Sequence, residues 1–223
     1  MKKLVTFYSD SHAVLYEDFF LKSFLKNIKD CSLKTKKVDQ LSPTGEWASE
    51  KFNVVTLEKI RWILTNIDLN DSNNLIYADC DVQFLNDINV DLGEHDILFQ
   101  KDYDNICSGF FICKQNERIK YFFENVEKEL AQQIQSRSTC DDQWVINQFL
   151  TKSPRNKKYL DLKFGYLPSD EYWTVGNSLS GKVWVGQDFV CPGRIVVHHA
   201  NFTIGIERKI NLMKIVKQKL GLE

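Results

Sequence analysis

Two aspartates separated by a single residue give this sequence its clearest chemical signal. Asp79 and Asp81 come directly after the apolar run Leu75-Ile76-Tyr77-Ala78, and a second apolar stretch begins at Val82. Ligands of open α/β sheets bind beyond the carboxyl ends of the strands, and alternate residues of an extended chain project to one side. Both carboxylates can therefore share one Mg²⁺ or Mn²⁺, ions that take oxygen ligands and often bind substrate phosphates as well. The pattern predicts a metal site for a phosphorylated substrate.

Three other groups of residues could complete such a site, and each also has a purely structural interpretation. They are Ser108-Gly109-Phe110-Phe111, the stretch Asp141-Asp142-Gln143-Trp144-Val145-Ile146-Asn147, and His198-His199-Ala200-Asn201 with Gly205 and Lys209. The first could simply permit close strand packing, the second could cap a helix and complement its dipole, and the third could end an apolar strand. We expect one of the two histidines to face the core and the other to face the acidic pair.

The spacing of apolar residues predicts the elements that position these groups. Strands and helices alternate over residues 1–80, which is the signature of a parallel sheet with crossover helices. We expect strands at 2–8, 33–38, 75–78, 96–100, 109–113, 183–185 and 195–198, helices at 12–28, 54–67, 117–135, 141–150 and 206–220, and a loop at 42–45. The sequence therefore predicts one α/β domain whose second half is less regular, with Trp47 and the other tryptophans mostly in its core.

Composition and charge exclude several classes of protein. The chain has 223 residues, of which 43% are hydrophobic and 26% charged, as in a folded soluble domain. It carries 29 basic and 30 acidic residues, so a general nucleic-acid binder is not indicated. No apolar run approaches the roughly 20 residues of a membrane span, and we interpret 1–8 as part of the fold rather than as a leader. The six cysteines form no CxxC pair, so we expect reduced thiols and a cytoplasmic location.

Taken in chain order, these blocks resemble the glycosyltransferases of the A-type fold, in particular the nucleotide-diphospho-sugar transferases of the family 77 type. The resemblance spans nearly the whole chain and implies a single domain over 1–223 with a Rossmann-like, mostly parallel central sheet flanked by helices. It implies a nucleotide-sugar-binding half at 1–100 and an acceptor-side half with a C-terminal helix at 101–223. The implied reaction is metal-dependent transfer of a sugar from a nucleoside-diphosphate-sugar, with UDP favoured, to a hydroxyl of a glycan or glycoconjugate.

The resemblance also implies roles for single residues. Asp79, Asp81 and His199 would form a site for Mn²⁺ or Mg²⁺, with Asp81 and His199 as direct ligands and Asp79 mainly serving the ribose or a metal-bound water. The other residues implied to contact the donor are Thr6, Phe7, Tyr8, Lys59, Ser108, Gly109, Asn201, Gly205 and Lys209, the last reaching the diphosphate. Asp142 and Gln143 are the implied catalytic residues. Asp142 is the candidate general base if the reaction inverts, whereas the retention suggested by the family would not need that base.

Other interpretations fit parts of the pattern. A D-x-D after a strand also occurs in haloacid-dehalogenase-type phosphatases, but here the motif lies far from residue 1 and Gln83 stands where Thr or Val is expected. A module that binds nucleotide sugars or glycans without turnover would keep the same residues. Lys59 could lie on a solvent-exposed helix face, and Trp173 is the best candidate for a platform that stacks on a sugar. The basic segment 206–220 fits either a helix packed on the domain or a peripheral contact with an anionic membrane.

Overall fold

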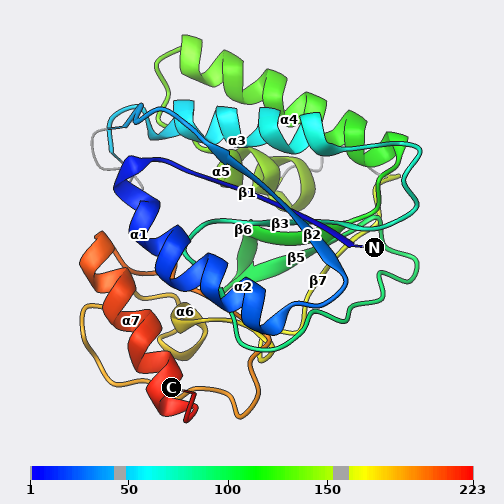
Figure 1. Cartoon of the computed structure of the whole chain (residues 1–223). Helices are drawn as coiled ribbons and strands as arrows, with labels where there is room; N and C mark the ends of the chain where they lie inside the picture. Colours follow the sequence, from blue (N-terminus) through cyan, green and yellow to red (C-terminus); the bar gives the residue numbers. More distant parts are fainter. Residues whose placement is uncertain (1, 43–48, 153–160, 223) are drawn as a thin grey trace.

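The computed structural model describes residues 2–42, 49–152 and 161–222, and a six-stranded sheet forms its centre (Figure 1). Across the sheet the strands are β2 (Cys31–Lys37), β1 (Lys2–Tyr8), β3 (Leu75–Ala78), β6 (Asn105–Cys113), β5 (Ile97–Asp102) and β7 (Phe164–Tyr166). The pairs β1–β2, β1–β3 and β5–β7 are parallel, whereas β6 runs antiparallel to both of its neighbours. The expected mostly parallel central sheet is confirmed.

Helices cover both faces of this sheet (Figure 1). On one face, α3 (Phe52–Asn66), α4 (Glu117–Gln135) and α5 (Asp142–Asn147) share a core cluster with Val5 and Tyr77. The other face carries a helical region made of η1 (Asp10–His12), α1 (Ala13–Leu15), η2 (Tyr16–Leu21) and α2 (Lys22–Asn27), which packs on Leu4 and Ile76. Neighbouring residues of β1 and β3 are thus buried on opposite faces, which explains why these strands appear in the sequence as continuous apolar runs.

A second, three-stranded sheet connects the acidic pair to the C-terminal part of the chain. Its strands, in order, are β4 (Val82–Phe84), β9 (Val197–His199) and β8 (Tyr172–Thr174). β4 begins immediately after Asp81, and the register of the sheet pairs Val82 with His199. The backbone pairing of this small sheet therefore places the end of β9 beside the two aspartates, although they are more than 100 residues apart in the sequence.

Most predicted elements are present, with ends shifted by a few residues. The strand predicted at 183–185 is wrong: the Trp184 N–H donates to the Phe202 carbonyl at 2.6 Å, but the segment forms no strand. The helix predicted at 12–28 is divided by the π-helical turns of η2, and the helix predicted at 141–150 ends early and continues as η3 (Gln148–Lys152). Residues 43–45 of the predicted loop and Trp47 lie outside the described residues. The six cysteines are free.

The C-terminal helix α7 (Ile206–Lys219) packs on the domain next to α6 (Val175–Ser178). Its side chains Leu212, Met213 and Val216 are fully buried. Two of its lysines also bind the protein, since Lys217 Nζ lies 5.4 Å from the centroid of the Phe19 ring and Lys219 pairs with Asp188 at 2.8 Å. Within the described ranges, none of the helices has the length and apolar character needed to cross a membrane.

Asp96, a buried carboxylate directly before β5, leads to a prediction about stability. Asp96 is fully buried and accepts hydrogen bonds from the Lys163 N–H at 3.0 Å, from Asn116 Nδ2 at 3.0 Å and from Arg118 Nη2 at 2.6 Å. Burial alone would raise the pKa of Asp96, but these donors hold the pKa below its usual value. The carboxylate therefore stabilises the protein at neutral pH, and this contribution is lost as the pH falls through the lowered folded-state pKa.

We expect Asp96→Asn to lower the free energy of unfolding at pH 7 by about 2–3 kcal/mol, because it leaves charged and polar donors without their ionised acceptor. The loss of stability on acidification, measured by urea titration between about pH 5 and pH 3, should be shallower in the variant. The exposed Asp104→Asn serves as the control and should match the wild type. An Asp96→Asn variant with wild-type stability and wild-type pH dependence would contradict this interpretation.

Candidate active site

A cavity of about 410 Å³ opens at the carboxyl ends of β1 and β3. Its walls come from the end of β1, from η1, α3 and α5, from the hairpin of β5 and β6, and from the segment between β9 and α7. Asp79, Asp81 and His199 are among its lining residues. This is the edge of an open α/β sheet at which ligands are expected.

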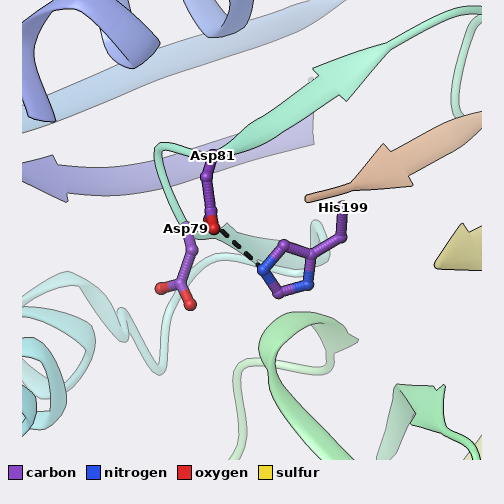
Figure 2. Close-up of side chains that lie close together, drawn as sticks. All are labelled: Asp79, Asp81 and His199. Carbon is purple, nitrogen blue, oxygen red and sulfur yellow. Dashed lines mark ion pairs between the residues drawn. The ribbon is translucent and has the colours of Figure 1, made fainter. Parts of the chain in front are cut away.

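Three side chains in this cavity have the geometry of a metal site. Asp79, Asp81 and His199 each offer a ligand atom, and these atoms lie within 4.8 Å of one another. Figure 2 shows that the two carboxylates and the imidazole ring converge from the β3–β4 turn and the end of β9. Two carboxylate oxygens and one imidazole nitrogen suit Mn²⁺ or Mg²⁺, which leave further coordination positions for substrate oxygens. The residues present therefore fit the divalent cation that the sequence predicts.

Glycine at position 109 allows these side chains to approach β6. A Cβ added to Gly109 would overlap His199 Cε1 and would lie 2.6 Å from Asp79 Oδ2. The backbone is close as well, because the Asp79 N–H donates to the Gly109 carbonyl at 2.8 Å. The strand in this place must lack a side chain for both groups to occupy the same space.

Asp81 is ionised and held by two cationic partners. Lys209 Nζ lies 2.5 Å from its Oδ2, and His199 Nε2 lies 3.2 Å from its Oδ1. Burial alone would raise the pKa of Asp81, but Lys209 and His199 bring it well below its usual value. Burial would also lower the pKa of His199, but the Asp81 carboxylate raises it to about 10. The other ring nitrogen of His199 lies 2.9 Å from Gln100 Oε1, which fixes the orientation of the ring.

Asp79 has one oxygen bound and one directed toward the cavity. The Tyr77 hydroxyl donates to Oδ1 at 2.5 Å, and Lys59 Nζ lies 3.4 Å from the same oxygen. Burial raises the pKa of Asp79, and the positive charge of Lys59 opposes this effect. Oδ2 is the oxygen that lies next to Gly109, which lines the cavity.

Lys59 lies at the centre of a buried charge network, so the solvent-exposed interpretation of this residue is wrong. Its ammonium is 2.9 Å from Asp142 Oδ2 and 3.2 Å from Ser108 Oγ, and the residue is only 3% exposed. Burial would lower its pKa, but Asp142 and Asp79 raise it, so the ammonium stays charged. The capping interpretation holds for the neighbouring Asp141, whose Oδ1 accepts from the Trp144 N–H at 2.8 Å.

Gln143 links β6 to Asp102, a residue that the sequence did not single out. Its Oε1 accepts from the Ser108 N–H at 3.1 Å, and its Nε2 donates to Asp102 Oδ2 at 2.6 Å. The other oxygen of Asp102 is buried and has no hydrogen-bond partner among the described residues. Burial raises the pKa of this carboxyl. Asp102 lies at the end of β5 and contacts Gln143 of α5. This contact between distant segments leaves no local pattern in the sequence.

His12 is a second cavity residue that the sequence analysis did not assign to the site. It is buried at the end of η1, and its Nδ1 lies 2.9 Å from Ser11 Oγ. Burial and the charge of Lys209 lower its pKa to about 4, so the ring is neutral at pH 7. His12 follows the polar turn at the end of β1, which is a common place for binding residues. In the sequence it was instead interpreted as the first residue of the helix expected at 12–28.

The remaining predicted residues divide between the cavity and the core. Phe7, Tyr8 and Asn201 line the cavity. Thr6 is fully buried and is not among the lining residues, and Gly205 lies just before α7 with a φ of 95°, outside the lining. Both residues thus support the backbone of the site rather than facing the cavity.

The histidine expected in the core is His198. Its Nδ1 lies 2.9 Å from Gln83 Nε2, and burial lowers its pKa to about 3. The Trp173 ring packs against it with 5.4 Å between ring centroids and is only 2% exposed. The prediction of Trp173 as a sugar-stacking platform is therefore wrong, because its ring is buried in a core cluster with Trp184 and Phe189.

Comparison with solved structures shows where else this fold occurs. A glycosyltransferase involved in glycosylation of the major capsid of PBCV-1 matches with a TM-score of 0.60 and 10% identity, over 96% of this chain and 98% of the other. A galactosyltransferase, LgtC, solved with donor and acceptor sugar analogues, matches with a TM-score of 0.53 and 10% identity over 96% and 95%. The glycosyltransferase GlyE of Streptococcus pneumoniae TIGR4 matches with a TM-score of 0.55 and 11% identity over 97% of this chain. This chain spans 62% of the length of GlyE.

Sequence comparison assigns the family. No curated protein matches the chain by sequence. A profile of the nucleotide-diphospho-sugar transferases matches residues 15–213, which contain the acidic pair, the α5 residues and His199. This match favours sugar transfer over the phosphatase interpretation of the D-x-D. With the glycosyltransferase A-type fold and most of its length matched, the chain belongs to the nucleotide-diphospho-sugar transferase family.

Proposed function

We propose that the protein transfers a sugar from a nucleoside-diphosphate-sugar, with UDP favoured, to a hydroxyl of a glycan or glycoconjugate, in the manner of family 77. The observation that carries this proposal is the convergence of Asp79, Asp81 and His199 within 4.8 Å at the carboxyl edge of the sheet. It occurs in a chain that belongs to a family of sugar transferases. The Lys209 ammonium lies directly beside the acidic pair, where a diphosphate would need positive charge.

Different residues of the cavity would bind different parts of the donor. Asp81 and His199 would hold Mn²⁺ or Mg²⁺, and Asp79 would serve the ribose or a metal-bound water. When bound, the cation would act as a Lewis acid for the charge that develops on the leaving diphosphate. Lys209 would bind the diphosphate as a second cation. Phe7 and Tyr8, at the end of β1, would bind the nucleoside side of the donor.

The sugar would lie over the first half of β6, near Ser108 and Gly109. Gln143 and Asp142 bound this region, each already oriented by a contact to Ser108 or Lys59. Asp142 forms an ion pair with Lys59. Asp142 could therefore act as a general base only after this ion pair breaks. This arrangement supports retention over inversion, and NMR assignment of the anomeric configuration of the product tests it.

A thermal-shift screen of nucleoside-diphosphate-sugars with and without Mn²⁺ tests the function. We expect one donor to raise the melting temperature by several degrees, and only when Mn²⁺ is present, because binding to the native state raises apparent stability. Asp81→Asn should lose this shift, while the exposed Asp104→Asn should keep it. Metal-independent stabilisation, or a shift that persists in Asp81→Asn, would contradict the proposed site. Donor binding without transfer to any acceptor would favour a binding module instead.

We place the reaction in the cytoplasm, at soluble or membrane-bound acceptors. A peripheral membrane contact would involve the exposed basic side chains of α7, Arg208 and Lys214, which point away from its buried face. Co-sedimentation with anionic vesicles tests this contact. Equal binding by the wild type and by a variant with both side chains replaced by glutamine would argue against it.

A further inference from the structure

Lys209 engages one of the two oxygens with which Asp81 would bind a cation. Its ammonium is 2.5 Å from Asp81 Oδ2, and His199 Nε2 is 3.2 Å from Asp81 Oδ1. Both oxygens of the expected direct ligand are therefore engaged by side chains of the same chain. A metal ion can reach Oδ2 only if the ammonium of Lys209 leaves it.

Asp79 supplies few coordinating oxygens to a metal ion that binds without a diphosphate. Its Oδ1 accepts from the Tyr77 hydroxyl at 2.5 Å and lies 3.4 Å from Lys59 Nζ, whereas Oδ2 lies beside Gly109, which lines the cavity. One carboxylate oxygen is a weak site for Mn²⁺ or Mg²⁺, which need several ligands. The affinity for the ion thus depends on what happens to Lys209.

The charges of the cavity point the same way. The carboxylates of Asp79, Asp81 and Asp142 face three cationic groups, the ammonium groups of Lys59 and Lys209 and the imidazole of His199, so the charges balance. A divalent cation alone would leave uncompensated positive charge in a largely buried place, which is costly. A cation together with a doubly charged diphosphate keeps the balance.

Lys209 itself requires a partner. Its side chain is only 16% exposed, and burial opposes its charge. If a metal ion took its place on Asp81, the ammonium would be left desolvated beside a second cation. A diphosphate provides the acceptor that it then needs.

We propose that Lys209 makes the binding of metal and nucleoside diphosphate mutually dependent, by holding the place of the metal on Asp81 until a diphosphate accepts its ammonium. This inference rests on the proposed function and describes how the same site is regulated. Each ligand alone meets an unbalanced site, and by linkage each strengthens the other by the same factor. The protein would thus reject free metal ions and free nucleotides at concentrations at which it binds the pair.

Mn²⁺ titrations followed by electron paramagnetic resonance test the proposal, with UDP as the probe nucleotide. In the wild type we expect UDP to strengthen Mn²⁺ binding by about 10-fold or more. Lys209→Met should bind Mn²⁺ alone about 10-fold more tightly than the wild type, because the competing ammonium is gone, and UDP should then strengthen Mn²⁺ binding by less than about 3-fold. Lys209→Arg, which keeps the charge, should retain weak binding of Mn²⁺ alone. Lys214→Met on the exposed face of α7 is the matched control and should behave as the wild type.

The outcomes separate this proposal from the proposed function. If folded Lys209→Met, checked by circular dichroism, binds Mn²⁺ alone no more tightly than the wild type, Lys209 does not compete with the metal and the proposal is overturned. Lone-metal binding by Lys209→Arg as tight as that of Lys209→Met would also overturn it, because charge would not be the cause. If Lys209→Met does not fold, the wild type alone still tests the proposal, because Mn²⁺ binding that is equally tight with and without UDP contradicts it. Failure of the wild type to bind any nucleoside diphosphate with Mn²⁺ would instead refute the proposed function.

Discussion

Gly109→Ala is expected to weaken binding of the divalent cation strongly while the protein stays folded. The new methyl group would overlap the His199 ring and crowd Asp79 Oδ2, so both ligands must move away from their present positions. β6 cannot retreat to make room, because it is hydrogen-bonded to β3 on one side and to β5 on the other. We expect Mn²⁺ affinity and the rate of sugar transfer each to fall by on the order of 100-fold or more.

Isothermal titration with Mn²⁺ and UDP, together with kcat, measures this effect. Gly193→Ala is a matched control, because Gly193 has nothing within 4 Å of an added Cβ. Circular dichroism and thermal unfolding verify that Gly109→Ala is folded. Wild-type metal affinity in that variant would show that His199 and Asp79 do not bind the ion together.

Lys59→Met is expected to cause the largest loss of stability among the variants of the cavity. Methionine fills much of the same space but leaves the buried carboxylates of Asp142 and Asp79 without their cation. Removing one partner of a buried ion pair costs about 3–5 kcal/mol, which is a large part of the stability of a typical domain. Burial raises the pKa of Asp79 and the charge of Lys59 opposes this effect. Removing Lys59 therefore favours the protonated carboxyl in the folded state, and the deficit should shrink as the pH is lowered toward 5.

Urea denaturation at pH 7 and pH 5 measures both parts of this expectation. The exposed Lys128→Met on α4 is the control for loss of a lysine. The double variant Lys59→Met/Asp142→Asn should recover part of the stability, because it removes one of the two buried carboxylates that lack a counter-ion. A deficit under 1 kcal/mol, or no recovery in the double variant, would mean that Lys59 is not the counter-ion that holds these two carboxylates.

The sequence predicted the sheet and the place of the acidic pair at its edge because their signals are local. The apolar run before Asp79 and the helical spacing of α4 follow from burial alone, and the bounds predicted at 75–78 and 117–135 match β3 and α4. The choice of His199 over His198 also has a physical basis, since neighbouring residues of a strand point to opposite faces. Once β9 pairs with β4, one ring must enter the core and the other must face Asp81.

Contacts between distant segments could not be predicted in the same way. Lys209 meets Asp81 only because α7 returns across the small sheet, and Asp102 faces Gln143 only because the hairpin bends toward α5. Trp173 was misassigned because an aromatic residue in a polar stretch resembles a binding platform until its burial is known. Lys59 shows the same limit, since its burial depends on α5 and β6 rather than on the pattern of its own helix.

Because β6 runs antiparallel to β5, the two strands form a hairpin whose length can change without moving the rest of the sheet. The hairpin turn at Tyr103 and Asp104 follows the Asp102–Asn105 pair, on the side where β3 has already ended at Ala78. An insertion of two residues in each arm of the turn would lengthen the wall beside the cavity and keep every inward side chain facing inward. Under the proposed function, acceptor selectivity would then vary with the length of this hairpin, while Ser108 and Gly109 at its base would keep their positions.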